Sequence, residues 1–281
     1  MRKNRLPTPL DRAAKLRYDL IEWHKLTQKE ITERDKKGFS FLMHIISYGH
    51  WTNLPPKFKE FSLTQPATDE DKIIHLMARN GKLNTIPKKF ITEEMLSLKG
   101  NKKESVYHLL AQENYPHHID ESLWTRKALT LTSYDDCTPL HSLVQYQPKL
   151  LPKDITLEDL LLPNIDGETP LYMWARSSHW SEIPDKFLTK KTLELKVGYG
   201  EFETLTHHLA ERFKNDRILK SAENMGPINL KMKQILSKIN DTLLHSLLKN
   251  EDPCLAKYIK GELAKRRMVK ELSQSEQYLE I

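Results

Sequence analysis

Five histidines recur at similar spacing along the chain, and histidine is both a frequent metal ligand and a frequent general base. They are His75, His108, His141, His207 and His245. Side chains placed one per repeat of about 33 residues lie on successive layers roughly 10 Å apart. An ion held by bonds of about 2.1 Å cannot join them. We therefore expect structural histidines and predict no metal site.

Other residues capable of chemistry are also better explained by structure. Cys137 and His141 would form a nucleophile and base pair if their side chains met, but an ordinary, partly exposed thiol at a turn is the better explanation of Cys137. The acidic clusters 69–71 and 135–136 fall where turns are expected, so we interpret them as solvated carboxylates. The chain contains none of the common glycine-rich phosphate-binding, nucleophile-elbow or zinc-protease motifs. We predict a protein that is not an enzyme and that needs no cofactor.

Composition limits the architecture and the compartment. The 281 residues are 29% charged and 38% hydrophobic, and only nine are glycine, which favours helices over turn-rich β structures. No apolar stretch reaches the roughly 18–20 residues of a membrane span, and the N-terminal residues lack a signal-peptide core. Cys137 and Cys254 show no disulfide or zinc spacing. We expect a protein of a reducing cytoplasm, either bacterial or that of a host.

The elements that position these residues repeat along the sequence. Thr138-Pro139-Leu140-His141 recurs as Thr169-Pro170-Leu171-Tyr172, in which Thr suits a helix N-cap and Pro suits the first helical turn. Equivalent positions lie 31 to 38 residues apart, at Asp11, Met43, His75, His108, His141, Tyr172, His207 and His245. This spacing predicts a tandem repeat, with a helix beginning near each marker.

A second element follows the first in each repeat. Apolar-proline pairs recur after the first helix, at 54–55, 86–87, 151–152 and 183–184, and an interior proline breaks a helix. Thr92, Thr156 and Thr189 then precede further apolar pairs and suit helix N-caps. We predict units made of a first helix, a brief turn ending at proline, and a short Thr-capped second helix.

The pattern resembles the ankyrin repeat, whose unit of about 33 residues opens on Thr-Pro-Leu-His, and it is similar to divergent arrays of bacterial and phage-type proteins. The resemblance implies an all-α, ankyrin-like helical-repeat solenoid of about seven to eight units over residues 1–250. The turn glycine of the family is present as Gly38 and Gly167, and Glu70, Lys103 and Asp136 replace it elsewhere. Residues 251–281 are expected to form an amphipathic, basic capping helix and tail.

The resemblance also implies a function and a binding surface. Ankyrin arrays bind proteins on a concave face made from hairpin tips and the exposed positions of the first helices. We expect a non-catalytic module that binds a protein partner, as an inhibitor, immunity factor or adaptor would, with no membrane and no small-molecule substrate. The partner-binding residues predicted in this way are Lys36, Lys37, Phe39, Tyr48, Arg79, Asn80, Gln112, Tyr134, Gln145, Tyr146, Arg176 and Arg212.

A second function class stays open because the chain is basic. The net charge is +6, and the densest basic block, Lys265-Arg266-Arg267 with Lys257, Lys260 and Lys270, falls on the expected C-terminal helix. The block is either a solvated face of a capping helix or a contact for nucleic acid or an acidic partner. Salt distinguishes phosphate binding from an aromatic protein interface, since phosphate contacts weaken steeply as salt rises.

The repeat register generates a stability prediction. Leu140 is expected to face the core shared by the helices of its unit, so Leu140→Ala should lower the free energy of unfolding by about 2–5 kcal/mol. Urea denaturation followed by circular dichroism measures this change. A loss below about 1 kcal/mol would show that the register is wrong.

Overall fold

The structure, a computed structural model, describes residues 7–113, 115–196, 204–219, 230–248 and 252–279, and within them the regular elements are helices. This confirms the all-α prediction at the level of secondary structure. In these segments no helix combines the length and the apolar character that crossing a bilayer requires. The chain divides into two compact units, residues 1–143 with 149–155, and residues 144–148 with 156–281.

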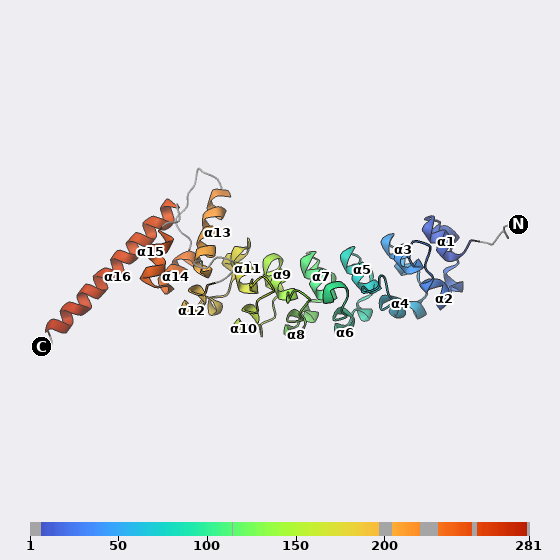
Figure 1. Cartoon of the computed structure of the whole chain (residues 1–281), viewed down its shortest axis with the longest axis horizontal. Helices are drawn as coiled ribbons and strands as arrows, with labels where there is room; N and C mark the ends of the chain where they lie inside the picture. The colour runs from blue at the N-terminus through green and yellow to red at the C-terminus, as the bar shows by residue number, and fades with distance from the viewer. Residues whose placement is uncertain (1–6, 114, 197–203, 220–229, 249–251, 280–281) are drawn as a thin grey trace. The chain divides into compact units, whose positions relative to one another are not determined.

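Unit 1 alternates two kinds of helix, which lie along its two edges (Figure 1). On the first edge α1, α3, α5 and α7 lie in sequence, and α1 contacts α3, α3 contacts α5, and α5 contacts α7. The bounds are α1 Pro9–Ala14, α2 Gln28–Thr32, α3 Phe41–Ser47, α4 Pro56–Leu63, α5 Ile73–Arg79, α6 Glu93–Leu96, α7 Val106–Gln112 and α8 Arg126–Leu129, and α9, Pro139–Tyr146, crosses into unit 2.

The predicted break and short second helix are both present. A single 3-10 turn precedes the apolar-proline pair, as Leu83–Thr85 precedes Ile86-Pro87. Pro87 is then the N-cap of a further 3-10 turn, Lys88–Phe90. The Thr92 hydroxyl accepts the backbone N–H of Met95 at 3.3 Å and caps α6. Thr156 and Thr189 cap α10 and α12 in the same way, as predicted. Such a hydroxyl satisfies one of the N-terminal amides that a helix leaves without a partner and so marks where the helix begins.

Unit 2 starts with the same pattern and then departs from it. Its helices are α10 Leu157–Leu160, α11 Pro170–Arg176, α12 Lys190–Leu193, α13 Leu205–Leu219, α14 Leu230–Lys238, α15 Asp241–Leu247 and α16 Pro253–Leu279. α13 has 15 residues, whereas α11 has 7, and it contacts α11, α12 and α14. From Leu205 onward the described helices no longer follow the long and short alternation.

The last marker of the sequence pattern is in the wrong register. By analogy with Thr138 and His141, Thr242 would be the N-cap of this helix and His245 would lie in its first turn. In the structure Asn240 caps α15, its side-chain oxygen accepting the backbone N–H of Leu243 at 2.8 Å, and His245 is exposed in the last turn. Asparagine is as good an N-cap as threonine, and it lies two residues earlier.

The core lies between the two kinds of helix. Leu140 and Leu171 are 0% and 1% exposed, which confirms their predicted burial. Large side chains of the turns and of the second helix layer add to this core, and Trp51 and Trp124 are almost fully buried. Burial of aromatic surface from the turns lets a second element of only one helical turn contribute to stability.

Left-handed backbone marks two recurrent positions. At the tips between units, Lys103 and Asp136 adopt positive φ where Gly38 and Gly167 do elsewhere, so the predicted replacements keep the turn conformation; the structure gives no positive φ for Glu70. At the ends of the first helices, Gly49 and Gly81 have φ of 78° and 61°. The equivalent residue after α1 is Leu16, with φ of 57°, and its side chain is 52% exposed.

Leu16 generates a stability prediction. A left-handed conformation costs a non-glycine residue about 1–2 kcal/mol, and glycine has a higher chain entropy to lose, so Leu16→Gly should raise the free energy of unfolding by about 0.5–1 kcal/mol. The matched variant is Gly49→Ala, because no atom lies within 4 Å of the added Cβ and only φ is strained. It should lose about 1 kcal/mol. Urea denaturation measures both, and a destabilised Leu16→Gly would contradict the expectation.

Candidate interaction surface

The recurrent histidines bind backbone groups. The Ser105 backbone N–H donates to His108 Nδ1 at 3.0 Å, so the ring proton lies on Nε2, which donates to the Cys137 carbonyl of the next repeat at 3.1 Å. His75 repeats this arrangement, accepting from the Lys72 N–H and donating to the Leu98 carbonyl. Both rings are buried. Each therefore links the start of its own helix to the following tip, and it must be neutral to do so.

His141 and His207 begin in the same way. The Thr138 and Thr204 backbone N–H groups donate to the Nδ1 atoms of these rings at 3.0 and 3.1 Å. His207 Nε2 then donates to the Ser246 hydroxyl at 3.0 Å. Among the residues that the structure describes, no group of three or more His, Cys, Asp or Glu side chains has the arrangement of a metal site.

Hairpin tips connect the units, and we use the word for segments 33–40, 66–72, 99–105 and 132–138. A single antiparallel bridge closes each of the first three, such as Arg34 with Ser40 and Lys99 with Ser105. In the first tip, Asp35 Oδ1 accepts the backbone N–H groups of Lys37 and Phe39 at 2.8 and 3.0 Å. These bonds fix the turn and direct its side chains outward.

Neighbouring tips are fastened to each other by hydrogen bonds to main-chain oxygens. Arg34 donates to the Gly38 carbonyl of its own tip at 2.7 Å and to the Pro66 and Ala67 carbonyls of the next at 2.9 and 3.1 Å. Lys99 Nζ donates to the Thr132 carbonyl at 2.6 Å. Such bonds hold consecutive tips in register.

Backbone N–H groups add two further fasteners in unit 1. The Asn101 N–H donates to Asp71 Oδ1 at 2.8 Å, and the Tyr134 N–H donates to the Lys102 carbonyl at 2.7 Å. Gly100 lies so close to Asp71 that an added Cβ would lie 2.3 Å from its carboxylate. The four tips therefore form one connected surface before any partner binds.

The links that Arg34 and Lys99 form between tips were not predicted from the sequence. Arg34 and Lys99 each lie six residues before the serine that caps the next helix, Ser40 and Ser105. The signal was present in this shared position of two basic residues. The density of basic residues along the chain does not show this signal, whereas the position of each basic residue within its repeat does.

Most of the predicted partner-binding residues lie on the surface of the unit that contains them. Exposed side chains are those of Lys36, Lys37, Phe39, Tyr48, Arg79, Asn80, Gln112, Tyr134, Tyr146 and Arg176. Gln145 and Arg212 are half-buried instead. Arg212 lies on α13, the long helix that departs from the repeat, so the counting that placed it on an exposed face does not apply there.

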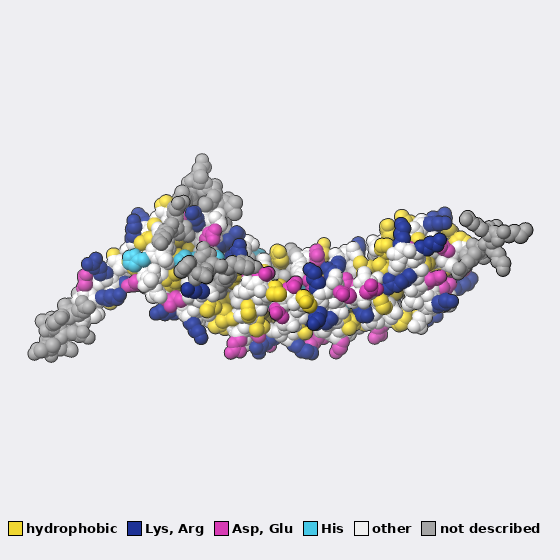
Figure 2. All heavy atoms as spheres, in the orientation of Figure 1, with side chains coloured by type: hydrophobic (Ala, Val, Ile, Leu, Met, Phe, Trp, Pro, Cys, Tyr) yellow, Lys and Arg dark blue, Asp and Glu magenta, His cyan; other side chains and the backbone are white. Residues whose placement is uncertain are grey.

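Four of the predicted residues surround one hollow, which we call the N-terminal groove. It has a volume of about 680 Å³ and lies over α1 and α3, where Figure 2 shows hydrophobic side chains beside Lys and Arg. Lys36, Lys37, Phe39 and Tyr48 line it. The other lining residues are Thr8, Leu10, Asp11, Ala14, Glu33, Arg34, Asp35, Met43, His44 and Ser47.

Two further predicted residues of unit 1, Arg79 and Gln112, bind Glu104, and a third, Asn80, binds its own helix. Arg79 NH2 lies 3.3 Å from Glu104 Oε2, and Gln112 Nε2 donates to Glu104 Oε1 at 3.2 Å. Asn80 donates to the Leu76 carbonyl at 2.8 Å and closes the end of α5. Beyond this cluster Tyr134 is 69% exposed, with the Lys103 amino group 5.9 Å from its ring centroid.

In unit 2 a smaller hollow of about 340 Å³ contains Gln145 and Arg176. The Arg176 guanidinium lies 5.3 Å from the Tyr172 ring centroid, and NH1 donates to the Tyr172 hydroxyl at 2.9 Å. Glu168 lies 3.7 Å from the same nitrogen. Tyr146 is 44% exposed and is not among the residues lining this hollow.

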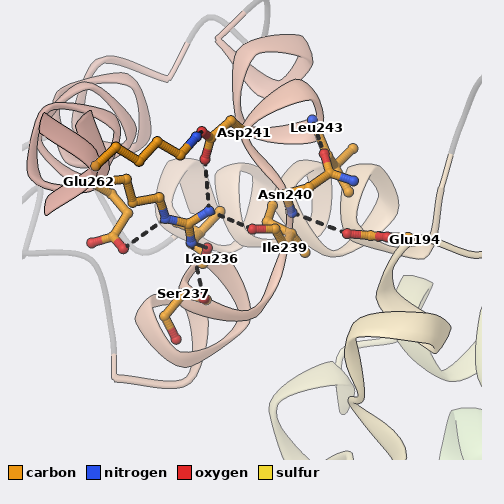
Figure 3. A network of polar contacts seen from close by, with 10 residues as sticks. Glu194, Leu236, Ser237, Ile239, Asn240, Asp241, Leu243 and Glu262 are labelled. Atoms are coloured by element: carbon orange, nitrogen blue, oxygen red, sulfur yellow. Dashed lines mark hydrogen bonds and ion pairs between the residues drawn. The ribbon is translucent and has the colours of Figure 1, made fainter. Parts of the chain in front are cut away.

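The basic block of α16 is partly used inside unit 2. Arg266 donates to the Leu236, Ser237 and Ile239 carbonyls at 3.1, 3.0 and 2.6 Å, at the end of α14 (Figure 3). These are carbonyls that the helix itself leaves without a partner, so Arg266 acts as a C-cap.

Two carboxylates complete this network. Arg266 also pairs with Asp241 at 3.1 Å and Glu262 at 3.2 Å, and Lys270 pairs with Asp241 at 2.9 Å. The hydrogen bonds from Lys270 and Arg266 lower the pKa of Asp241. Arg267 pairs with Glu271 at the surface. In the described part of the chain, Lys257, Lys260 and Lys265 form no ion pair, so they are the basic residues of this block still available to an anion.

Comparisons with known proteins do not identify the chain. No protein-family model matches it, and no curated protein matches it.

The histidine geometry generates a prediction of pH dependence. Burial lowers the pKa of His108 to about 4, although the bond to the Cys137 carbonyl opposes this effect. In the unfolded chain the pKa is about 6.5, so the unfolded state binds the proton first as pH falls. Stability is unaffected above pH about 6.5 and decreases progressively toward pH about 4, by up to roughly 3 kcal/mol for this residue.

The matched variant is His108→Gln. Glutamine at this position can accept the Ser105 N–H, as in an ordinary capping box, but it does not titrate. Urea denaturation at pH 7.5 and pH 5 should therefore show a smaller loss of stability for the variant than for the parent chain. An equal loss in both proteins would remove His108 as a source of the pH dependence.

Proposed function

We propose that the chain is an ankyrin-like repeat array that binds a protein partner across its hairpin tips and the exposed ends of its first helices. The support for the array is the recurrence of one arrangement: a capped first helix, a 3-10 turn, a second helix and a tip. The histidine rings of successive units join the start of each helix to the next tip. Such units contact chiefly their neighbours, which is the property of repeat proteins.

The observation that carries the binding proposal is the fastening of the tips in unit 1. Arg34, Lys99 and Asp71 join consecutive tips through main-chain groups. Binding to a surface that is already ordered costs less conformational entropy than ordering loops on contact. The fastened surface exposes aromatic side chains, with Tyr48 at 55% and Tyr134 at 69%, and tyrosine is enriched among the residues that dominate binding energy.

The alternative, nucleic-acid binding through α16, has less support. Arg266 caps α14, and Lys270 pairs with Asp241. A side chain held in this way must break those bonds before it can neutralise a phosphate. Three lysines remain, and each phosphate contact contributes little affinity at physiological salt.

The proposed role is that of a non-catalytic binding protein in the cytoplasm, as an inhibitor, immunity factor or adaptor. His75 and His108 are buried and bonded to the backbone on both ring nitrogens. Neither can act as a general base without breaking the links between units.

The test is capture of a protein partner from a lysate of the source cells, followed by binding measurements with the purified partner. Tyr134→Ala and Tyr146→Ala should each weaken binding by about 1–3 kcal/mol without changing the melting temperature, because both side chains are exposed. Titration calorimetry measures the affinity, and circular dichroism measures the melting temperature.

The control variant replaces Lys257, Lys260 and Lys265 by Ala. It should bind the partner normally, and a labelled DNA duplex should not bind the parent chain at physiological salt. If the lysine variant loses partner or DNA binding while both tyrosine variants retain it, α16 is the binding site and the proposal is wrong.

A further inference from the structure

The N-terminal groove is lined by three acidic residues, Asp11, Glu33 and Asp35, and three basic residues, Arg34, Lys36 and Lys37. The carboxylates of Asp11 and Asp35 already accept hydrogen bonds. The Asp11 carboxylate accepts the backbone N–H and the hydroxyl of Thr8, both at 2.9 Å, as part of the cap of α1. Asp35 holds the first tip through Oδ1, and its Oδ2 lies 3.2 Å from His44 Nε2. Burial tends to raise the pKa of Asp35, but the bonds from His44 and the backbone outweigh it and lower the pKa.

The amino groups of the groove are in a different situation. The Arg34 guanidinium donates hydrogen bonds to carbonyls of two tips. Lys36 and Lys37 are exposed at the edge of the groove, and within the described residues their amino groups form no ion pair or hydrogen bond. These two amino groups are therefore available to the carboxylates of an acidic ligand, whereas those of Asp11 and Asp35 on the same walls already bind within the chain.

Between the charged edge and the helices lies an apolar wall. Phe39 and Tyr48, which are 45% and 55% exposed, line the groove together with Leu10, Ala14 and Met43. Phe39 packs beside the His44 ring, with centroids 5.8 Å apart, and His44 is held by Asp35. The aromatic side chain is therefore positioned in advance, as the residues that anchor a ligand are in tight interfaces.

We propose that the N-terminal groove binds an acidic linear segment of a partner protein that carries one large apolar side chain. The apolar side chain enters between Phe39 and Tyr48, and the flanking carboxylates pair with Lys36 and Lys37. The volume of about 680 Å³ accommodates several side chains of an extended peptide. This inference rests on the proposed function, since it names the chemistry of the partner at one part of the same surface.

The experiment selects binders from a displayed library of random linear peptides against the full chain. The enriched sequences should combine acidic residues with an aromatic or large aliphatic residue. Binding of an enriched peptide, measured by fluorescence anisotropy, should weaken about tenfold or more in the double variant Lys36→Glu, Lys37→Glu, and also in Phe39→Ala. Raising the salt concentration should weaken the parent complex.

Lys190→Glu, Lys191→Glu is the matched control, because it makes the same change of charge at exposed lysines of unit 2. It should bind the peptide as the parent does, and melting temperatures should show that all variants fold. Unchanged binding in Lys36→Glu, Lys37→Glu would overturn the groove proposal, as would enriched sequences without acidic residues. Equal displacement of the peptide by a single-stranded oligonucleotide would also overturn it, in favour of a general anion site.

The two proposals fail in different ways. Peptides that bind the chain but lose affinity in Tyr146→Ala, and not in the groove variants, would overturn the groove proposal and leave the interaction function intact. Absence of any enriched peptide would overturn the groove proposal alone, since the interaction function is judged by the captured partner and the Tyr134→Ala variant.

Discussion

The imidazole that joins two backbone groups is the interaction on which the rest of the structure depends. His108 accepts an amide at the start of its own helix and donates to a carbonyl of the following tip, and His75 does the same one unit earlier. Both ring nitrogens are used, so the same contact fixes the tautomer, starts the helix and sets where the next unit begins. The hydrogen bond from Lys99 to the Thr132 carbonyl joins the same two neighbouring tips that the His108 ring joins.

The positions that local chemistry decides were predictable from the sequence. Some signals depend only on neighbouring residues: a threonine before a helix, a proline after an apolar residue, and a leucine at the start of a helix. Accordingly, α6, α10 and α12 begin where their caps were predicted. The same reasoning failed at α15, where Asn240 competes with Thr242 for the N-cap. When two residues satisfy the same rule, the packing of the helix decides between them, and packing is not visible in one sequence.

Contacts between units were harder to foresee. Arg34 reaches carbonyls 32 and 33 residues further along, and Arg266 reaches Leu236 from 30 residues away. Their partners are main-chain oxygens, which every residue type has, so the sequence does not show which residues are the partners. The groove was likewise not predicted as a hollow, although Lys36, Lys37, Phe39 and Tyr48, which line it, were each predicted to bind a partner. A repeat pattern identifies which positions share a face, and the depth of that face depends on side-chain packing.

The chemistry of the tip fasteners has an evolutionary consequence. Arg34 and Lys99 bind backbone carbonyl oxygens. Every residue has such an oxygen, so these bonds do not depend on which side chains the carbonyl-bearing residues carry. Mutations that alter side chains at positions such as Lys36, Phe39 or Tyr134 therefore leave the framework of the surface in place. A lineage carrying this scaffold can exchange one binding specificity for another through single substitutions, without an intermediate that fails to fold.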